Sequence, residues 1–475
     1  MKATPDENSI MKTIMAGDIT IYCPSPDVLA WCEENLIMPN PVFKNLMRRG
    51  QEHIIKAKHV QEKVKCFIRK NDSVIVPHGC LRGLWPFISR GSWELNYAPE
   101  HRTSFGSMLS SASLFDYQEE AVSELIKAKG GILKAGCGSG KTYVGIELLR
   151  RLGLRFLWLC GKSDLLNQTM ANFRSLYPKI DVGTITEGEV NMGKDGTIST
   201  VQTLINVDYR LYQDEFNVVI LDECHNLNSN PATRQMYAKV LARCKARYKY
   251  GLTATPVRQD GTAKMIYAYL GMSPRGTFYP AHVIKDSSTQ SLQARYETFD
   301  LNTPDSWEFL MADGTIDFSR LLNYLASNEE RTAKICQKAA ELAKEGRKIA
   351  LLTSRVEHSE SITLKLKEMG VSCGCVTGKT KKSVRKETLG NPDDWDVIVS
   401  TVQLFKEGLD IKALDTVLIA LPFKDAVGIQ QSEGRAERPL EGKKDPLFIF
   451  AFDKNIPYCQ QAETKMRRVV NRRRT

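Results

Sequence analysis

The sequence lacks any uninterrupted apolar run of about 18 residues, the minimum for a membrane-spanning helix, so no membrane partner is expected. Its first residues, Met-Lys-Ala-Thr-Pro-Asp-Glu, lack the apolar core of a secretion signal. The twelve cysteines form no C-x-x-C pair, and the nearest approach, Cys373 and Cys375, is too close for ordinary zinc pairing. Internal repeats are absent, and so are low-complexity segments apart from a basic tail. These absences predict reduced thiols and a cytoplasmic protein.

What the sequence does contain is an excess of positive charge on an ordinary globular composition. Its 475 residues include 66 Lys/Arg and 55 Asp/Glu, for a net charge of +11, and 42% of them are hydrophobic. The length indicates roughly three domains at about 150 residues each. The charge favours a polyanionic partner, although a basic soluble enzyme without such a partner has the same composition.

A glycine-rich stretch at 130–142 carries the first strong motif. An apolar run precedes it and a helix is predicted to begin at Lys141, which is the strand, loop and helix order of a phosphate-binding loop. Lys141 is then placed to reach the β- and γ-phosphates, and the Thr142 hydroxyl to hold Mg²⁺. The strict pattern has Gly where Ala135 stands, and the alternative is a flexible loop before an ordinary helix. The predicted contacts are Gly136, Gly138, Ser139, Gly140, Lys141 and Thr142.

Two adjacent acids follow a second apolar run. Residues 216–221 are predicted to form a buried strand, and Asp222 and Glu223 come directly after it. A carboxylate at a strand end can hold Mg²⁺ through water, and a neighbouring Glu can deprotonate an attacking water. Acids at a strand exit are common, but their position downstream of a phosphate loop favours a hydrolytic site with Asp222 on the metal and Glu223 as the base.

Residues 111–282 alternate apolar strands with helical segments, which predicts a parallel sheet covered by helices on both faces. Polar residues follow several of these strands, and ligands of such sheets sit at the carboxyl ends of the strands. Gln118 lies near the start of the helix before the loop. An amide can pair with N6 and N7 of adenine, although a surface glutamine on a helix is far commoner.

Residues 1–110 are predicted to form a small, basic α+β domain. The segment 41–90 holds eleven Lys/Arg and three Asp/Glu, a net charge of +8, with Phe43, Phe67, Trp85 and Phe87 interleaved. Cations with aromatic rings suit a nucleic-acid surface. The alternative is a solvated face over a core that needs those rings.

A second α/β unit is predicted at 329–460, after a connector at 283–328 and before a basic tail at 461–475. This unit has no phosphate loop of its own. It carries Arg435 and Arg438, three residues apart and hence on one helical face, which either neutralise charge on a γ-phosphate held by the first unit or are surface cations.

Taken in order, these motifs resemble helicase superfamily 2 over about 115–455. The series is Gln118, Ala135-Gly-Cys-Gly-Ser-Gly-Lys-Thr142, Asp222-Glu-Cys-His225, Thr253-Ala-Thr255, Lys406-Glu-Gly-Leu-Asp410 and Gln431-Ser-Glu-Gly-Arg-Ala-Glu-Arg438. Ala is common at the first loop position in these helicases. Within the superfamily the chain is most similar to the phage UvsW-type recombination helicases on the XPB-like branch, which implies a host-cell cytoplasmic setting if it is phage-encoded. The implied fold is α/β, with two RecA-like parallel-sheet domains in tandem plus the small N-terminal domain.

The resemblance implies a role for each motif. ATP and Mg²⁺ would be the cofactors, Gln118 would read adenine, and Gly408 and Asp410 would sense nucleotide and strand. Arg435 and Arg438 would act as arginine fingers, Gln431 would help place the water, and His225, Thr253 and Thr255 would couple hydrolysis to movement. The implied contacts to the nucleic-acid backbone are Gly161, Lys162, Thr200, Gln202, Arg355, Lys379, Lys381 and Lys382. The alternative for the basic cluster that begins at Lys379 is a solvated helix face. The family often has Pro-Thr where this chain has Gly161 and Lys162.

Three functions fit this series of motifs. The first is an ATP-dependent DNA helicase, monomeric on DNA, that acts on single-stranded and branched double-stranded DNA. The second is an RNA helicase of the same architecture, since a basic surface does not separate DNA from RNA. The third is an ATP-gated nucleic-acid clamp that remodels without separating strands. The motor of a restriction enzyme is a weaker fit, because no nuclease constellation is found.

Overall fold

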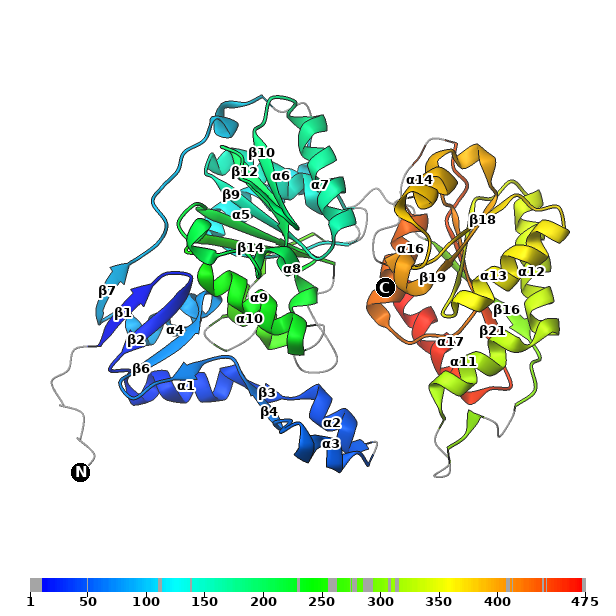
Figure 1. Ribbon diagram of the computed structural model, residues 1–475, viewed down its shortest axis with the longest axis horizontal. Helices are drawn as coiled ribbons and strands as arrows, with labels where there is room; N and C mark the ends of the chain where they lie inside the picture. Colours follow the sequence, from blue (N-terminus) through cyan, green and yellow to red (C-terminus); the bar gives the residue numbers. More distant parts are fainter. Residues whose placement is uncertain are drawn as a thin grey trace. The chain divides into compact units, whose positions relative to one another are not determined.

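The computed structural model describes residues 11–471 apart from 49, 110–112, 137–138, 229–230, 255–262, 274, 276–279, 285–293, 306–308, 312–315, 407–410, 412, 438–439 and 441. The chain divides into two compact units, here called unit 1 (Met1–Gly136 with Gly140–Lys285) and unit 2 (Asp286–Thr475 with Cys137–Ser139). Figure 1 labels their helices and strands. Each unit has its own β-sheet or β-sheets.

The N-terminal part of unit 1 contains a five-stranded sheet in the order β5-β6-β2-β1-β7. Apolar and polar residues alternate in β2, where Ile19 and Ile21 are buried and Thr20 is not. Ser25 caps helix α1 by accepting a hydrogen bond from the Val28 amide at 3.4 Å. The elements are β1 (Lys12–Met15), β2 (Asp18–Tyr22), α1 (Pro26–Leu36), β5 (Ile68–Arg69), β6 (Ser73–Pro77), α4 (Leu81–Ile88) and β7 (Ser92–Leu95).

A smaller substructure projects from this sheet (Figure 1). It consists of β3 (Ile37–Pro39), α2 (Pro41–Arg48), α3 (Glu52–Ala57) and β4 (Lys63–Lys65), with β3 and β4 paired antiparallel. We call residues 37–65 the N-terminal lobe.

The larger sheet of unit 1 has eight strands in the order β11-β10-β12-β9-β13-β14-β8-β15. From β10 to β15 all neighbours pair in parallel, and β11 joins β10 as an antiparallel edge. The elements are α5 (Asp116–Ala128), β8 (Gly131–Lys134), α6 (Lys141–Leu152), β9 (Phe156–Cys160), α7 (Ser163–Leu176), β10 (Val182–Thr186), β11 (Glu189–Asn191), β12 (Gly196–Thr200), α8 (Val201–Leu204), β13 (Val218–Asp222), α9 (Pro231–Arg243), β14 (Tyr248–Thr253), α10 (Ala263–Leu270) and β15 (Pro280–Val283).

Strand β9 shows why this sheet needs helices on both faces. All five of its residues are buried. Phe156 and Trp158 belong to one core, while Leu157 and Leu159 belong to another. Successive side chains of a strand point to opposite faces, so the continuous apolar run builds two cores at once.

The N-terminal sheet and the larger sheet share one of these cores. Ile19, Trp31 and Leu84 belong to the same buried cluster as Leu159, Leu221 and Leu270. The buried ammonium of Lys249, on β14, donates hydrogen bonds to the carbonyl oxygens of Gly17 at 2.6 Å and Leu241 at 2.7 Å. Residues 11–98 therefore fold against the larger sheet, and the boundary at residue 110 stays a prediction.

Unit 2 is built on a fully parallel sheet of six strands in the order β16-β21-β20-β17-β19-β18. The predicted connector at 283–328 contributes the edge strand β16 and helix α11 to this unit, and helix α17 runs through most of the predicted tail. The elements are β16 (Arg295–Leu301), α11 (Phe318–Ser327), α12 (Glu329–Lys344), β17 (Ile349–Thr353), α13 (Val356–Glu368), β18 (Cys373–Val376), α14 (Lys382–Gly390), β19 (Val397–Thr401), α15 (Val402–Lys406), β20 (Thr416–Ile419), α16 (Ala426–Ala436), β21 (Leu447–Asp453) and α17 (Pro457–Val470).

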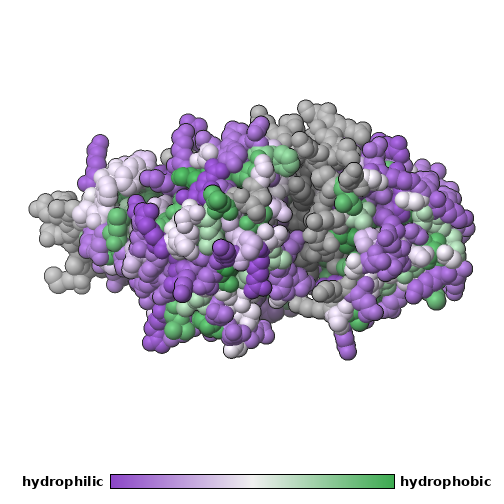
Figure 2. Space-filling model, turned by 90° about the horizontal axis from the view of Figure 1, so that it is seen from above, coloured by the Kyte–Doolittle hydropathy of each residue, from purple (hydrophilic) through white to green (hydrophobic). Residues whose placement is uncertain are grey.

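Hydrophilic residues cover most of the described surface on the face shown in Figure 2. Among the described residues, no helix is both long enough and apolar enough to cross a membrane.

A buried ion pair ties helix α12 to strand β21 in unit 2. Arg331 and Asp453 have side chains only 1% and 0% exposed, and Arg331 Nη2 lies 2.8 Å from Asp453 Oδ2. The guanidinium also donates to the Ala420 carbonyl at 2.6 Å, and the Thr303 hydroxyl donates to Asp453. Each charge is therefore desolvated and depends on its partner.

Replacing Arg331 by Met is expected to destabilise unit 2 by about 3–5 kcal/mol, because Asp453 is left as an uncompensated buried charge. Equilibrium urea unfolding measures this effect. Lys334→Ala serves as the control, since it removes an exposed ion pair with Glu330 on the same helix and should cost no more than about 1 kcal/mol. Equal effects of the two substitutions would contradict the account.

Candidate active site

The polar residues that follow the strands of the larger sheet meet at one edge. Because the strands from β12 to β8 are parallel and neighbouring, their carboxyl ends point the same way. The pairing register places Thr253 opposite Lys134 and Thr200 opposite Cys160. Thr200, Asp222 and Thr253 therefore lie at the ends of strands of one sheet, although they are far apart in the sequence.

The phosphate-loop candidate runs from the end of β8 to the start of α6. The Ala135 amide donates to the Thr253 carbonyl at 3.0 Å, which fixes the start of the loop to β14. Lys141 Nζ donates to the carbonyl oxygens of Ala135 at 3.2 Å and Gly136 at 3.0 Å. The ammonium thus bends over the loop whose amides are expected to face a phosphate. Ser139 is buried and Thr142 is half-buried in the first turn of α6, while Gly138 lies outside the described residues.

Gln118 supports this loop directly. Its side chain is 5% exposed, and its Oε1 accepts a hydrogen bond from the Phe115 amide at 3.0 Å, which caps α5. Gly140 has φ +77°, and a Cβ there would lie 2.3 Å from Gln118 Nε2. Only glycine fits at position 140, because the backbone is left-handed and the amide of Gln118 occupies the space of a side chain. The predicted contact to adenine stays a prediction.

The acidic pair ends β13 at the same edge. Asp222 is 7% exposed, and its Oδ1 accepts a hydrogen bond from the Glu223 amide at 2.9 Å. Burial, and then the neighbouring Glu223 carboxylate, raise the pKa of Asp222 well above its usual range, while the charge of Lys141 opposes this rise. The buried Asp222 carboxyl, the half-buried Glu223 carboxyl and the Thr142 hydroxyl supply oxygen ligands of the kind that Mg²⁺ prefers. The residues present therefore fit the metal that the motif implies.

His225 connects the acidic pair to strand β14. Its Nδ1 lies 3.1 Å from Glu223 Oε2 and 3.2 Å from the Thr253 hydroxyl, and Thr253 is fully buried. One imidazole ring therefore lies between the Glu223 carboxylate and the end of β14. The coupling role of His225 and Thr253 stays a prediction. Thr255 lies outside the described residues.

Some of the predicted nucleic-acid contacts are exposed, whereas others are buried or already hydrogen-bonded within the protein. Lys162, Gln202, Lys379 and Lys381 are exposed, whereas Gly161 is buried. Thr200 is buried and caps α8 by accepting from the Thr203 amide at 3.2 Å. Arg355 donates from Nε to Asn323 Oδ1 at 2.7 Å and from Nη2 to the Ser319 carbonyl at 3.1 Å, so its guanidinium is held by α11. The side chain of Lys382 lies outside the described residues.

Of the residues of unit 2 that are predicted to act on the nucleotide, only Arg435 has a described side chain. It lies on α16, is 9% exposed, and its guanidinium carbon is 5.3 Å from the centre of the Phe405 ring. Gly408, Asp410, Arg438 and the side chain of Gln431 lie outside the described residues.

Sequence reasoning did not find the contacts of the loop with β14 and Gln118. These contacts join residues that become neighbours only when the sheet and its helices assemble, so no local sequence pattern predicts them.

Two family models match the chain, one in the region of each parallel sheet. Residues 111–258 match the type III restriction enzyme res subunit family, and residues 330–439 match the helicase conserved C-terminal domain. The first match includes the phosphate loop and the acidic pair, and the second includes α16. The chain belongs to helicase superfamily 2. It is therefore an ATP-dependent enzyme of the helicase type, and its two parallel sheets are those of RecA-like helicase domains, as the motif order predicts.

Individual relatives within the superfamily differ in the nucleic acid that their names mention. One relative is L396 from Acanthamoeba polyphaga mimivirus, which is named as a candidate ATP-dependent RNA helicase. The two sequences are 24% identical over an alignment that covers 80% of this chain and 72% of L396. Another relative is the DNA 3'-5' translocase XPB2 from Sulfurisphaera tokodaii. The two sequences are 27% identical over an alignment that covers 71% of this chain and 80% of XPB2.

Solved structures agree with the fold. A fragment of a candidate HsdR subunit of a type I restriction enzyme from Vibrio vulnificus YJ016 matches 74% of this chain and 66% of that chain, at 19% identity and a TM-score of 0.54. T4 UvsW aligns over 98% of both chains at 16% identity, but the TM-score of 0.39 is too low to support a structural argument.

Proposed function

We propose that this member of helicase superfamily 2 is an ATP-dependent DNA helicase or translocase. Its proposed substrate is branched DNA, and its proposed work is fork reversal, junction branch migration or strand unwinding in recombination, replication or repair. One observation carries the proposal. Thr200, Asp222 and Thr253 end strands β12, β13 and β14 of one sheet. Lys141 begins the helix that follows β8, and Lys162 caps the helix that follows β9, at the same sheet edge. Candidate nucleotide and strand contacts therefore share one sheet.

In this proposal Lys141, Ser139 and Thr142 hold the phosphates and the metal from the loop, and Asp222 holds the metal from β13. Bound ATP supplies the phosphoanhydride, and Mg²⁺ neutralises charge on its oxygens. Glu223 accepts the proton of the attacking water, for which its place beside Asp222 and its contact with His225 suit it. His225 and Thr253 pass the change to β14, and Arg435 and Arg438 stabilise developing charge from unit 2.

The DNA assignment is supported by the basic N-terminal part and by the similarity to a protein named as a DNA translocase. Cations near the strand-contact edge bind phosphates of either nucleic acid, and the similarity to a protein named as an RNA helicase favours RNA as the second candidate.

A substrate panel tests the proposal. We expect ATP hydrolysis to be stimulated at least about tenfold by single-stranded, forked and four-way-junction DNA and much less by RNA of the same sequence. Strand displacement on the forked substrate should require hydrolysis. Stronger stimulation by RNA would replace the DNA assignment with the second candidate. Stimulated hydrolysis without displacement would favour an ATP-gated clamp.

A further inference from the structure

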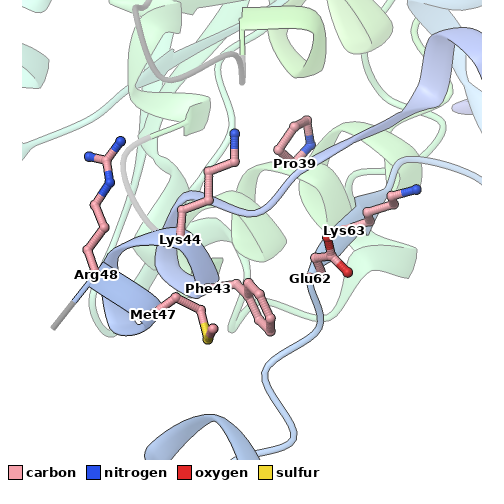
Figure 3. Close-up of a pocket in the computed structure, with 7 residues that line it drawn as sticks. All are labelled: Pro39, Phe43, Lys44, Met47, Arg48, Glu62 and Lys63. Carbon is pink, nitrogen blue, oxygen red and sulfur yellow. The ribbon is translucent and has the colours of Figure 1, made fainter. Parts of the chain in front are cut away.

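An open basin lies on the N-terminal lobe, well apart in sequence from the motifs described above. Its volume is about 440 Å³, in the range of cavities that take small organic groups. Figure 3 shows the ring of Phe43 beside Met47, with Lys44 and Arg48 extending from the same helix in another direction. The lining residues are Pro39, Phe43, Lys44, Met47, Arg48, Glu62 and Lys63.

The basin is held in shape by the buried side chain of Asn40. Its Oδ1 accepts a hydrogen bond from the Val42 amide at 3.1 Å, which caps the start of α2. Its Nδ2 donates to the Gln61 carbonyl at 2.7 Å, and its backbone amide donates to the Glu62 carbonyl at 2.8 Å. One residue thus locks the helix to the segment that enters β4, so both walls of the basin are fixed relative to each other.

The apolar lining is left uncovered by the lobe itself. Helices α2 and α3 contain no buried residue among those that the structure describes. Met47 is 44% exposed, and Phe43 is half-buried. Within the described part of the chain, no side chain pairs with Lys44, Arg48 or Lys63. A helix that buries none of its apolar residues gains little from folding there, which indicates that the surface serves a ligand.

The charge of the lobe selects the class of ligand. Residues 37–65 contain seven Lys/Arg and two Asp/Glu, for a net charge of +5. An apolar protein segment would leave three cations at the basin without partners. A nucleotide satisfies both features, because its base has a face that stacks on an aromatic ring and its phosphates bind cations.

We propose that this basin takes one unpaired nucleotide of a nucleic-acid strand. The base stacks on Phe43 beside Met47, and the flanking phosphates contact Lys44, Arg48 and Lys63. The proposal rests on the proposed function only in taking nucleic acid as the substrate. The lobe continues directly from α1, whose Trp31 and Leu36 belong to the core shared with the larger sheet. A base in the basin is therefore held at a fixed place on unit 1, as recognition of a junction requires.

Fluorescence anisotropy of the full chain with a fluorescein-labelled fork that carries unpaired thymidines tests the stacking. Phe43→Ala and Phe43→Leu are both expected to weaken binding about tenfold, because each removes the ring face. Phe43→Trp should stay within about twofold of the unmodified protein. Thermal unfolding of each variant confirms that it is folded, and the Trp variant tests the ring even if the Ala variant does not fold.

The cations are tested by the salt dependence of the same binding. Losing two phosphate contacts in a Lys44→Ala, Arg48→Ala double variant should reduce the slope of log K against log salt by about 1.4. Lys127→Ala is the control, since it removes an exposed cation from α5, outside the lobe. Glu62→Gln should strengthen binding, because it removes an acid from the basin lining.

Two outcomes would overturn the proposal. Binding by Phe43→Leu equal to that of the unmodified protein shows a surface that needs only apolar bulk, as a protein partner does. A double variant with the slope of Lys127→Ala shows that the cations do not meet phosphate. Neither result depends on the motor, because Phe43→Ala should keep the ATP hydrolysis rate reached at saturating single-stranded DNA. Absence of stimulated hydrolysis in the unmodified protein would instead contradict the proposed function.

Discussion

Replacing Glu223 by Gln should reduce nucleic-acid-stimulated ATP hydrolysis by about 10³-fold, equivalent to about 4 kcal/mol of barrier. Glutamine keeps the shape of the side chain but cannot accept the proton of the attacking water. The variant should still bind a nucleotide analogue and DNA, since Lys141, Thr142 and the exposed Lys162 are unchanged. Phosphate release at saturating single-stranded DNA measures the loss, and anisotropy measures the retained binding.

Lys141→Ala should lose the same activity by a different route. Lys141 donates to the loop carbonyls of Ala135 and Gly136 and is the cation expected on the phosphates, so its loss should weaken nucleotide binding as well. DNA binding should remain measurable. Glu34→Gln, an exposed change on α1, is the matched control and should leave hydrolysis intact. Full hydrolysis by either site variant would refute the site assignment.

Arg435→Ala should reduce hydrolysis by about 10³-fold or more if Arg435 serves as an arginine finger. Nucleotide binding to unit 1 should be nearly unchanged, because the arginine is needed for the transition state and not for the ground state. Arg435→Lys should recover little, since a point charge does not reproduce the guanidinium fork. Steady-state rates at saturating DNA, together with nucleotide affinity, separate these effects.

A structural role for Arg435 predicts a different result. The guanidinium lies 5.3 Å from the Phe405 ring centre, so the residue also packs within unit 2. If packing is its only role, Arg435→Ala should lower the thermal midpoint and lose activity in proportion to the unfolded fraction. Arg467→Ala is the control, because Arg467 lies over the Tyr296 ring at 5.8 Å on the surface of the same unit.

Local pattern was sufficient for most elements of the fold. The β2 alternation, the continuous apolar runs of β9 and β13 and the glycine-rich turn before α6 are visible in the sequence because each depends on neighbouring residues. Residues 283–328 show a weaker local pattern. The strand-like pattern at 291–299 indicates β16, and the structure confirms a strand at Arg295–Leu301. Its partner β21 lies about 150 residues later, and no local signal shows so distant a pairing.

The sequence by itself determined that this chain carries a phosphate loop, an acidic pair and the ordered motifs of a helicase, because such motifs need fixed residue types at short spacing. Only the tertiary structure decided that Gln118 packs against Gly140, that His225 bridges Glu223 and Thr253, and that the N-terminal sheet shares a core with the motor. It also showed that the apolar and basic residues of the N-terminal lobe form one uncovered basin. These facts depend on which strands and helices become neighbours, and chain folding brings together residues that no sequence window contains.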